Sequence, residues 1–256
     1  RMLGETYFDQ KKYNQAIRYF KAYLDISDNR MDEEGYYKLA YAYFKTQNDE
    51  EAIKYFKLAA LGDGALVQVS SFYLGQLYLR NKNIEYAIRS FEKASSGKDK
   101  SIAEEASFLT GKVTYQRNQF SECINHFQQF LKDYPSSKFR QEVNQLMAQA
   151  YLKTSNYDQA ISYLETLPTK SESLKRAYQN ATFHKGQLLF NDQRFSEAIP
   201  VLKKSTSVPL DKEMASKGYY LLGECYSLNN QLSEAVRAYQ QCKSLSNTSS
   251  IWNINS

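Results

Sequence analysis

Small residues recur along the chain at two positions that are always twelve residues apart, and apolar residues follow them at fixed offsets. The first small column consists of Gly4, Ala40, Gly75, Gly111, Ala148, Gly186 and Gly223. The second small column consists of Ala16, Ala52, Ala87, Cys123, Ala160, Ala198 and Ala235. Successive members of a column lie 35 to 38 residues apart, and self-similarity at this period is typical of a helical repeat array.

Two amphipathic helices, here called A and B, are predicted in every repeat. An aromatic or aliphatic residue stands three positions after most members of the first column, and others stand one and four positions after the second. Spacings of three and four place these residues on one face of a helix. Where a Gly or Ala on helix A faces an Ala or Cys on helix B, the two helices can cross closely. We therefore expect about fourteen helices of roughly 11–17 residues, joined by short polar turns.

The third repeat carries the most complete pattern of the seven. Its Gly75, Tyr78, Ala87, Phe91 and Ala94 resemble the small–aromatic–small–aromatic–small pattern of the tetratricopeptide repeat family. Further matches are Pro135, at the end of a repeat, and the pairs Leu3–Gly4, Leu39–Ala40, Leu74–Gly75 and Leu222–Gly223. The chain departs from the family in lacking a tryptophan early in helix A, and in carrying Lys185 and Leu189 in the sixth repeat.

The resemblance implies an all-α fold, a right-handed α-solenoid of about seven antiparallel helix pairs. It implies one tetratricopeptide superhelix over residues 1–246, with repeats near 4–26, 33–61, 65–96, 101–134, 137–167, 172–206 and 211–245. Residues 247–256, which contain the only tryptophan, Trp252, are expected to form a C-terminal tail or cap. The family also implies a non-catalytic, protein-binding scaffold rather than an enzyme.

Charge and hydropathy narrow the classes of partner. The 33 basic and 28 acidic residues are interleaved and leave a net charge of +5, so a mixed-charge surface is favoured over a nucleic-acid-binding one. No run approaches the ~20 apolar residues that span a bilayer. The chain starts at Arg1, inside a predicted helix and without a signal peptide, so we expect a mature form or a fragment.

The residues that usually carry chemistry are scattered. His126 and His184 lie in different repeats, without metal-ligand spacing to any Cys or carboxylate. Cys123 occupies a small column and is expected to be buried. A disulfide between Cys225 and Cys242 is an alternative to their burial as thiols. No cofactor or metal site is predicted.

A second stripe on the A helices lies outside the predicted core. Its columns fall three residues before, one after and four after the first small column, which is the i, i+4, i+7 spacing of one helical face. In proteins similar to this family the A helices line the concave surface, so we predict a partner-binding groove there. The predicted groove residues are Tyr37, Tyr41, Phe44, Phe72, Gln76, Phe108, Lys112, Tyr115, Gln149, Phe183, Gln187, Phe190 and Tyr220. The alternative is that the aromatic rings pack against the adjacent repeat.

These observations predict a scaffold that binds a peptide or protein segment on its concave face. The middle column of the stripe contains no Asn, so the family's clamp for chaperone tails is not expected. Residues 130–139, with the segment Tyr134-Pro135-Ser136, resemble a junction of bacterial envelope tetratricopeptide proteins. That resemblance implies the bacterial periplasm or the inner face of the outer membrane. The alternatives are an adaptor part of a larger protein, whose enzyme or nucleic-acid-binding domain lies elsewhere, and a self-assembling array.

Overall fold

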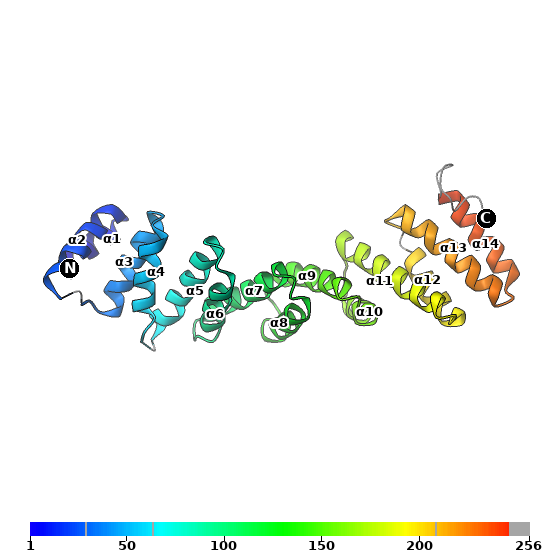
Figure 1. Ribbon diagram of the computed structural model, residues 1–256, viewed down its shortest axis with the longest axis horizontal. Coiled ribbons are helices and arrows are strands. Elements are labelled where there is room, and N and C mark those ends of the chain that lie inside the picture. The colour runs from blue at the N-terminus through cyan, green and yellow to red at the C-terminus, as the bar shows by residue number, and fades with distance from the viewer. Residues whose placement is uncertain (29, 63, 208, 246–256) are drawn as a thin grey trace. The chain divides into compact units, whose positions relative to one another are not determined.

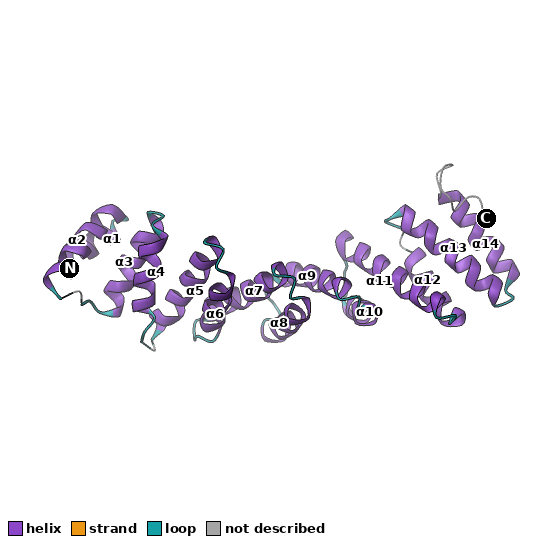
Figure 2. Cartoon of the chain, in the orientation of Figure 1, coloured by secondary structure: helices purple, strands orange, loops and turns teal. Residues whose placement is uncertain are grey.

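A computed structural model describes residues 1–28, 30–62, 64–207 and 209–245 of the chain. These residues form fourteen α-helices and no strand (Figure 2). The shortest helix has 8 residues and the longest has 20, a wider range than predicted. The number and type of the helices confirm the all-α fold. The predicted tail, residues 247–256, lies outside the described residues.

The chain divides into two compact units, and the division falls between Phe139 and Arg140. Unit 1 contains α1 (Met2–Asp9), α2 (Tyr13–Ile26), α3 (Glu33–Lys45), α4 (Asp49–Ala59), α5 (Ala65–Arg80), α6 (Ile84–Ser95), α7 (Lys100–Gln116) and α8 (Phe120–Asp133) (Figure 1). Unit 2 contains α9 (Arg140–Lys153), α10 (Tyr157–Thr166), α11 (Glu172–Asn191), α12 (Phe195–Thr206), α13 (Lys212–Leu228) and α14 (Leu232–Leu245). One continuous superhelix over both units stays a prediction.

Each unit consists of helix pairs in which the odd-numbered helix is A and the even-numbered helix is B. In unit 1 the A helices α1, α3, α5 and α7 contact one another in order, in addition to their own B helices. In unit 2 the A helices α9, α11 and α13 do the same. The A helices therefore form a shared layer within each unit, and side chains on its free face can act together.

The two small columns mark the points where the helices of a pair cross. Ala52, Ala87 and Cys123 are fully buried. A Cβ atom built on Gly75 would lie 2.5 Å from Cε1 of Phe91, a separation that side chains do not tolerate. The predicted reason for small residues at these columns, close approach of A and B, is thus confirmed.

Each crossing is filled by a side chain four residues after the second small column. In unit 1 this residue is always a fully buried phenylalanine: Phe20, Phe56, Phe91 and Phe127. In unit 2 it is Leu164 or Leu202, both fully buried, and then the half-buried Tyr239. The two units share the repeat but fill it with side chains of different volume.

The sixth repeat departs from the pattern as the sequence indicates. Lys185 stands where most repeats have a buried apolar residue, and its ammonium forms an ion pair with Asp158 at 2.7 Å instead of packing inward. Pro200 is the sixth residue of α12 and lies within the helix. The disulfide alternative is wrong, because Cys225 and Cys242 are both buried free thiols.

The turns between A and B helices share a backbone conformation that the sequence does not predict. Each turn contains one residue with φ between 53° and 61°, always seven positions after the first small column: Lys11, Gln47, Lys82, Asn118, Ser155, Gln193 and Asn230. The following amide donates back into helix A, for example from Asn83 to the carbonyl oxygen of Tyr78 at 2.8 Å. This is a Schellman ending without the glycine that usually marks one.

Candidate functional site

The predicted groove residues do not form one exposed stripe. Phe108 and Phe183 are only 4% and 6% exposed. The ring of Phe108 stacks on that of Phe139 with centroids 4.3 Å apart, and a Cβ built on Gly218 of α13 would lie 3.8 Å from Cδ2 of Phe183. The expectation that these two rings are accessible to a partner is therefore wrong, because neighbouring segments of their own units cover them.

The other predicted residues are at least partly exposed. In unit 1 they are Tyr37, Tyr41, Phe44, Phe72, Gln76, Lys112 and Tyr115, and in unit 2 they are Gln149, Gln187, Phe190 and Tyr220. Only in unit 1 does the structure bring several of them into one cluster of rings.

This cluster, here called the aromatic surface, consists of Phe8, Tyr13, Tyr37, Tyr41, Phe44 and Tyr73. Tyr41 lies at its centre. Its ring centroid is 5.4 Å from that of Tyr73 and 5.8 Å from that of Phe8, and both contacts are edge-to-face. Edge-to-face contact at 4.5–7 Å is the favoured geometry of aromatic pairs. All six rings are partly exposed, so together they form a continuous half-buried surface.

Tyr73 joins the second and third repeats, although it is not among the predicted groove residues. Its ring centroid lies 5.1 Å from that of Phe44 and 5.3 Å from that of the buried Phe56. Tyr73 stands two residues before Gly75 rather than three, and so falls outside the predicted columns. The sequence signal that could have identified Tyr73 is its aromatic side chain, on a helix whose opposite face is predicted to lie in the core.

Two phenols of the aromatic surface have raised pKa values. Burial raises the pKa of Tyr37 to about 12, and the neighbouring Tyr41 adds to the shift. The pKa of Tyr73 is also raised, first by burial and then by the nearby phenols of Tyr37 and Tyr41. Tyr37 and Tyr73 therefore keep their hydroxyl protons well above neutral pH.

Cations lie against these rings. Nζ of Lys45 is 5.1 Å from the centroid of Tyr41 and 6.0 Å from that of Phe44. The guanidinium carbon of Arg80 is 5.3 Å from the centroid of Phe44, and Nε of Arg80 donates to Oδ2 of Asp49 at 2.6 Å. Both placements are within the range of cation–π attraction.

The corresponding layer of unit 2 holds small separate groups of rings. The ring of His184 contacts those of Tyr157 and Phe183, with centroids 5.5 and 5.2 Å apart. Phe190 contacts Phe195, with centroids 5.5 Å apart, and Tyr220 contacts Tyr239 at 6.1 Å. The hydroxyl of Tyr239 donates to Glu224 at 2.6 Å. The described part of unit 2 therefore offers a more polar surface, without a cluster comparable to the one around Tyr41.

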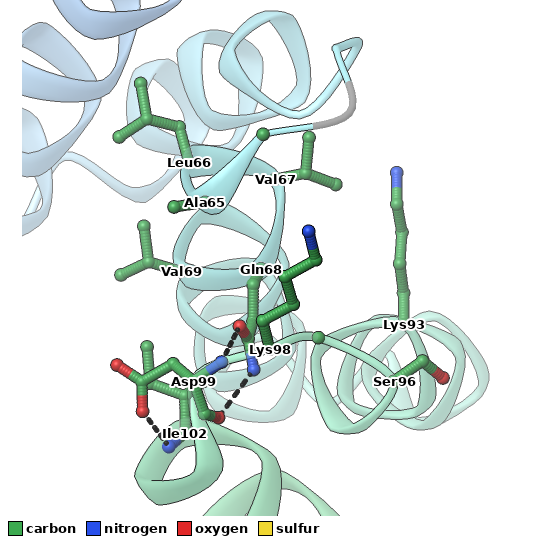
Figure 3. Close-up of a pocket in the computed structure, with 12 residues that line it drawn as sticks. Ala65, Leu66, Val67, Gln68, Val69, Lys93, Ser96, Lys98, Asp99 and Ile102 are labelled. Atoms are coloured by element: carbon green, nitrogen blue, oxygen red, sulfur yellow. Dashed lines mark hydrogen bonds between the residues drawn. The ribbon is translucent and has the colours of Figure 1, made fainter.

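Unit 1 also has a pocket of about 600 Å³, formed by the start of α5, the end of α6 and the start of α7 (Figure 3). Leu66, Val67 and Ile102 contribute apolar walls, and Gln68 lies inside with its amide directed at the backbone of Asp99. Nε2 of Gln68 donates to the carbonyl oxygens of Ala94 and Asp99 at 3.0 and 2.9 Å, and Oε1 accepts from the Asp99 amide at 2.9 Å.

Gln179 makes the same connection in unit 2, with its amide bound to N and O of Asp211 at 2.9 Å each. Both glutamines stand seven residues before the first small column of their repeats. Each ties an A helix to the loop that leads into the next A helix. Because the polar groups of Gln68 bind the backbone, we assign this side chain and the pocket around it a structural role rather than a role in ligand binding.

The described residues contain no group of three or more His, Cys, Asp or Glu side chains placed to hold a metal ion. Among the same residues, no helix combines the length and apolar character that crossing a membrane requires.

The fold resembles several solved structures at low sequence identity. A chain in the structure of Naa15/Naa10 bound to HypK-THB matches with a TM-score of 0.59 and 19% identity over 94% of this chain. The C-terminal part of a TPR repeat-containing protein from Cytophaga hutchinsonii matches with a TM-score of 0.52 and 16% identity, covering 98% of this chain and 97% of that one. A tetratricopeptide repeat protein from Parabacteroides merdae matches with a TM-score of 0.50 and 14% identity, covering 98% and 93%.

The chain spans about a third, 36%, of the matched chain in the Naa15/Naa10 structure. No curated protein matches the sequence. At such identities the structural likeness concerns the fold alone.

Family models give the assignment. Three models described as tetratricopeptide repeat match residues 1–65 with 146–211, residues 105–137, and residues 216–249. The first of these covers just over half of the chain. The repeat columns, the A–B helix pairs and these matches agree, and the chain belongs to the tetratricopeptide repeat family.

Proposed function

We propose that the chain is a protein-interaction scaffold and that its main docking site is the aromatic surface of unit 1. Tetratricopeptide repeats are in general non-catalytic interaction scaffolds, which supports a protein partner. The observation that carries the proposal is the run of ring contacts centred on Tyr41, which joins five half-exposed rings of the A helices α1, α3 and α5 with Tyr13 at the start of the B helix α2. Tyrosine is enriched among the residues that dominate binding energy at interfaces.

The aromatic surface would bind by apolar anchoring. Its rings supply contact area at a low cost in conformational entropy, since each has few rotatable bonds. Gln76 and Lys112, on the following A helices of unit 1, are half-exposed and would contact the backbone of an extended or helical segment. We assign Gln149, Gln187, Phe190 and Tyr220 of unit 2 a secondary role, because they lack a shared cluster.

The second candidate is an adaptor within a larger assembly. It is favoured by the likeness to a chain of the Naa15/Naa10 structure, of which this chain spans only 36%. That structure holds its chains together with HypK-THB. A role in a bacterial envelope assembly rests on residues 130–139 alone and stays a prediction; fractionation of the source cells followed by immunoblotting tests it.

Site-specific photo-crosslinking tests the docking site. A photoreactive phenylalanine analogue placed at Tyr41 reports on the aromatic surface, and the same analogue at Tyr86 provides a matched control. Tyr86 is exposed on the B helix α6 of the same unit. After irradiation in an extract of the source cells, we expect protein adducts from position 41 and few from position 86. Adducts from position 86 alone would move the docking site to the outer B-helix face.

A further inference from the structure

The lysine at the end of α3 differs from the other cations of the aromatic surface. Lys45 is exposed, and its ammonium lies over both Tyr41 and Phe44. Among the described residues it forms no ion pair. A partner that covers the central rings would therefore meet this charge directly.

The neighbouring cations are already neutralised by the chain itself. Lys38 forms an ion pair with Glu34 at 2.8 Å, and Arg80 pairs with Asp49. The charges of Lys38 and Arg80 are therefore balanced within the unit. Among the described residues, Lys45 is the remaining cation of α3 and α5, and a partner could balance its charge.

The charges around these rings disfavour a polyanion. Arg80, which lies over Phe44, is already paired with Asp49, and the charge of Glu105 acts on the Tyr73 phenol. A nucleic-acid backbone would bring several phosphates to a surface where Lys45 is the one unpaired cation of α3 and α5 among the described residues, and where Glu105 repels them. A single carboxylate placed at Lys45 needs no further cation.

We propose that the aromatic surface selects a protein segment with an acidic residue beside an apolar anchor, and that Lys45 contacts the acidic residue. This proposal rests on the proposed function. The apolar anchor packs against Tyr41, Phe44 and Tyr73. The Lys45 ammonium, which lies over the rings of Tyr41 and Phe44 in the free protein, then contacts the carboxylate of the segment instead. The ammonium lies 5.1 Å from the Tyr41 centroid, so anchor and carboxylate must share one face of the segment. Residues i and i+2 of a strand, roughly 7 Å apart, or i and i+4 of a helix, roughly 6 Å apart, meet this requirement.

Peptide selection tests this chemistry without knowledge of the natural partner. The probe is a library of short random peptides fused through their C-termini to a phage coat protein, so that no free terminal carboxylate is present. Selection is carried out on the wild type, Lys45→Glu and Lys153→Glu. Lys153 is the matched control, because it is the exposed final residue of the A helix α9 and stands at the same repeat position in unit 2.

The wild type and Lys153→Glu should enrich Asp and Glu about threefold or more beside aromatic or large aliphatic residues, and Lys45→Glu should lose this enrichment. A selected peptide, resynthesised with an amidated C-terminus, should bind Lys45→Glu about five- to tenfold more weakly than wild type at low salt. Its Glu→Gln analogue should bind both proteins equally. Circular dichroism confirms that the variants are folded.

The outcomes separate the two proposals. Selected peptides that depend on Phe44 but show no acidic preference would overturn the role of Lys45 and leave the docking site intact. Peptides that bind Phe44→Ala as well as wild type, or a selection that yields no binders, would overturn both. A single-stranded oligothymidylate that binds wild type and loses affinity in Lys45→Glu would replace the acidic segment with a nucleic acid.

Discussion

The free faces of the two A-helix layers differ far more than their cores do. In unit 1 the face carries five rings that, together with Tyr13 of α2, contact one another around Tyr41. In unit 2 the exposed positions hold Gln149 and Gln187, and the nearby rings form small separate groups of two or three. Both faces rest on the same small columns and helix crossings. The repeat therefore fixes where side chains are presented, and the exposed columns decide what each unit can bind.

The cores of the two units differ in the size of the side chains that fill their helix crossings. Unit 1 fills its crossings with phenylalanine throughout, whereas unit 2 uses leucine and a half-buried tyrosine. A larger buried side chain removes more apolar area from water and leaves a larger cavity when truncated. We therefore expect the two units to respond unequally to equivalent substitutions.

The largest effect is expected from emptying a crossing. Phe91→Ala in unit 1 should lower the free energy of unfolding by about 4 kcal/mol, and Leu202→Ala in unit 2 by about 3 kcal/mol. Both side chains are fully buried. Urea unfolding gives the loss, and hydrogen exchange should place it in α5–α6 for the first variant and in α11–α12 for the second. Glu92→Ala, on the exposed face of α6, is the control and should be near neutral. A greater loss from Leu202→Ala would reverse the comparison.

The next effect concerns the glutamines that tie successive repeats together. Gln68→Leu and Gln179→Leu should each cost about 2 kcal/mol, because the partly buried backbone groups at Asp99 and Asp211 lose the side-chain partners that satisfy them. Thermal unfolding measures both. Similar losses are expected because the two side chains do the same work in both units. A neutral result for either would show that water replaces its bonds.

Binding should separate the units more sharply than stability does. Phe44→Ala should weaken a peptide selected on the wild type by about 2 kcal/mol, or roughly thirtyfold. Phe190→Ala, at the same repeat position in unit 2, should change the affinity by less than about threefold. Calorimetric titration at matched thermal stability measures both. Equal losses would extend the docking site to unit 2.

The smallest effect appears only in alkali. Burial raises the pKa of both Tyr37 and Tyr43 to about 12, above the ordinary value near 10. Folding thus favours the neutral phenols, so their contribution to stability is complete below pH ~10 and is lost as the pH rises towards about 12. Tyrosinate absorbance should show a late step that Tyr37→Phe and Tyr43→Phe each diminish. At neutral pH neither variant should lose stability through this linkage.

The buried architecture could be predicted from sequence because it depends on spacing within a helix. The columns of Gly75 and Ala87 located the crossings, and Phe91 the residue that fills one. The docking surface depends on how adjacent repeats meet. Phe72 and Phe108 share a column, yet Phe108 is covered by Phe139 while Phe72 stays half-exposed. Tyr73 enters the surface through contacts with the preceding repeat. Positions relative to neighbouring repeats are not encoded in helical periodicity, so Tyr13 and Tyr73 fall outside the predicted columns, whereas Phe8 lies in one of them.

The left-handed residue in each A–B turn has a consequence for redesign. Backbone hydrogen bonds close the turn, such as the one from the Asn83 amide to the carbonyl oxygen of Tyr78. The side chain of the left-handed residue takes no part in this closure. Lys, Gln, Asn and Ser all occupy the position here. These seven sites are therefore equivalent attachment points along one edge of the helix pairs, where a fluorophore or a surface tether could be added singly to map distances within each unit. Glycine at any of them would relieve the left-handed strain, so each turn can be labelled or stabilised independently of the others.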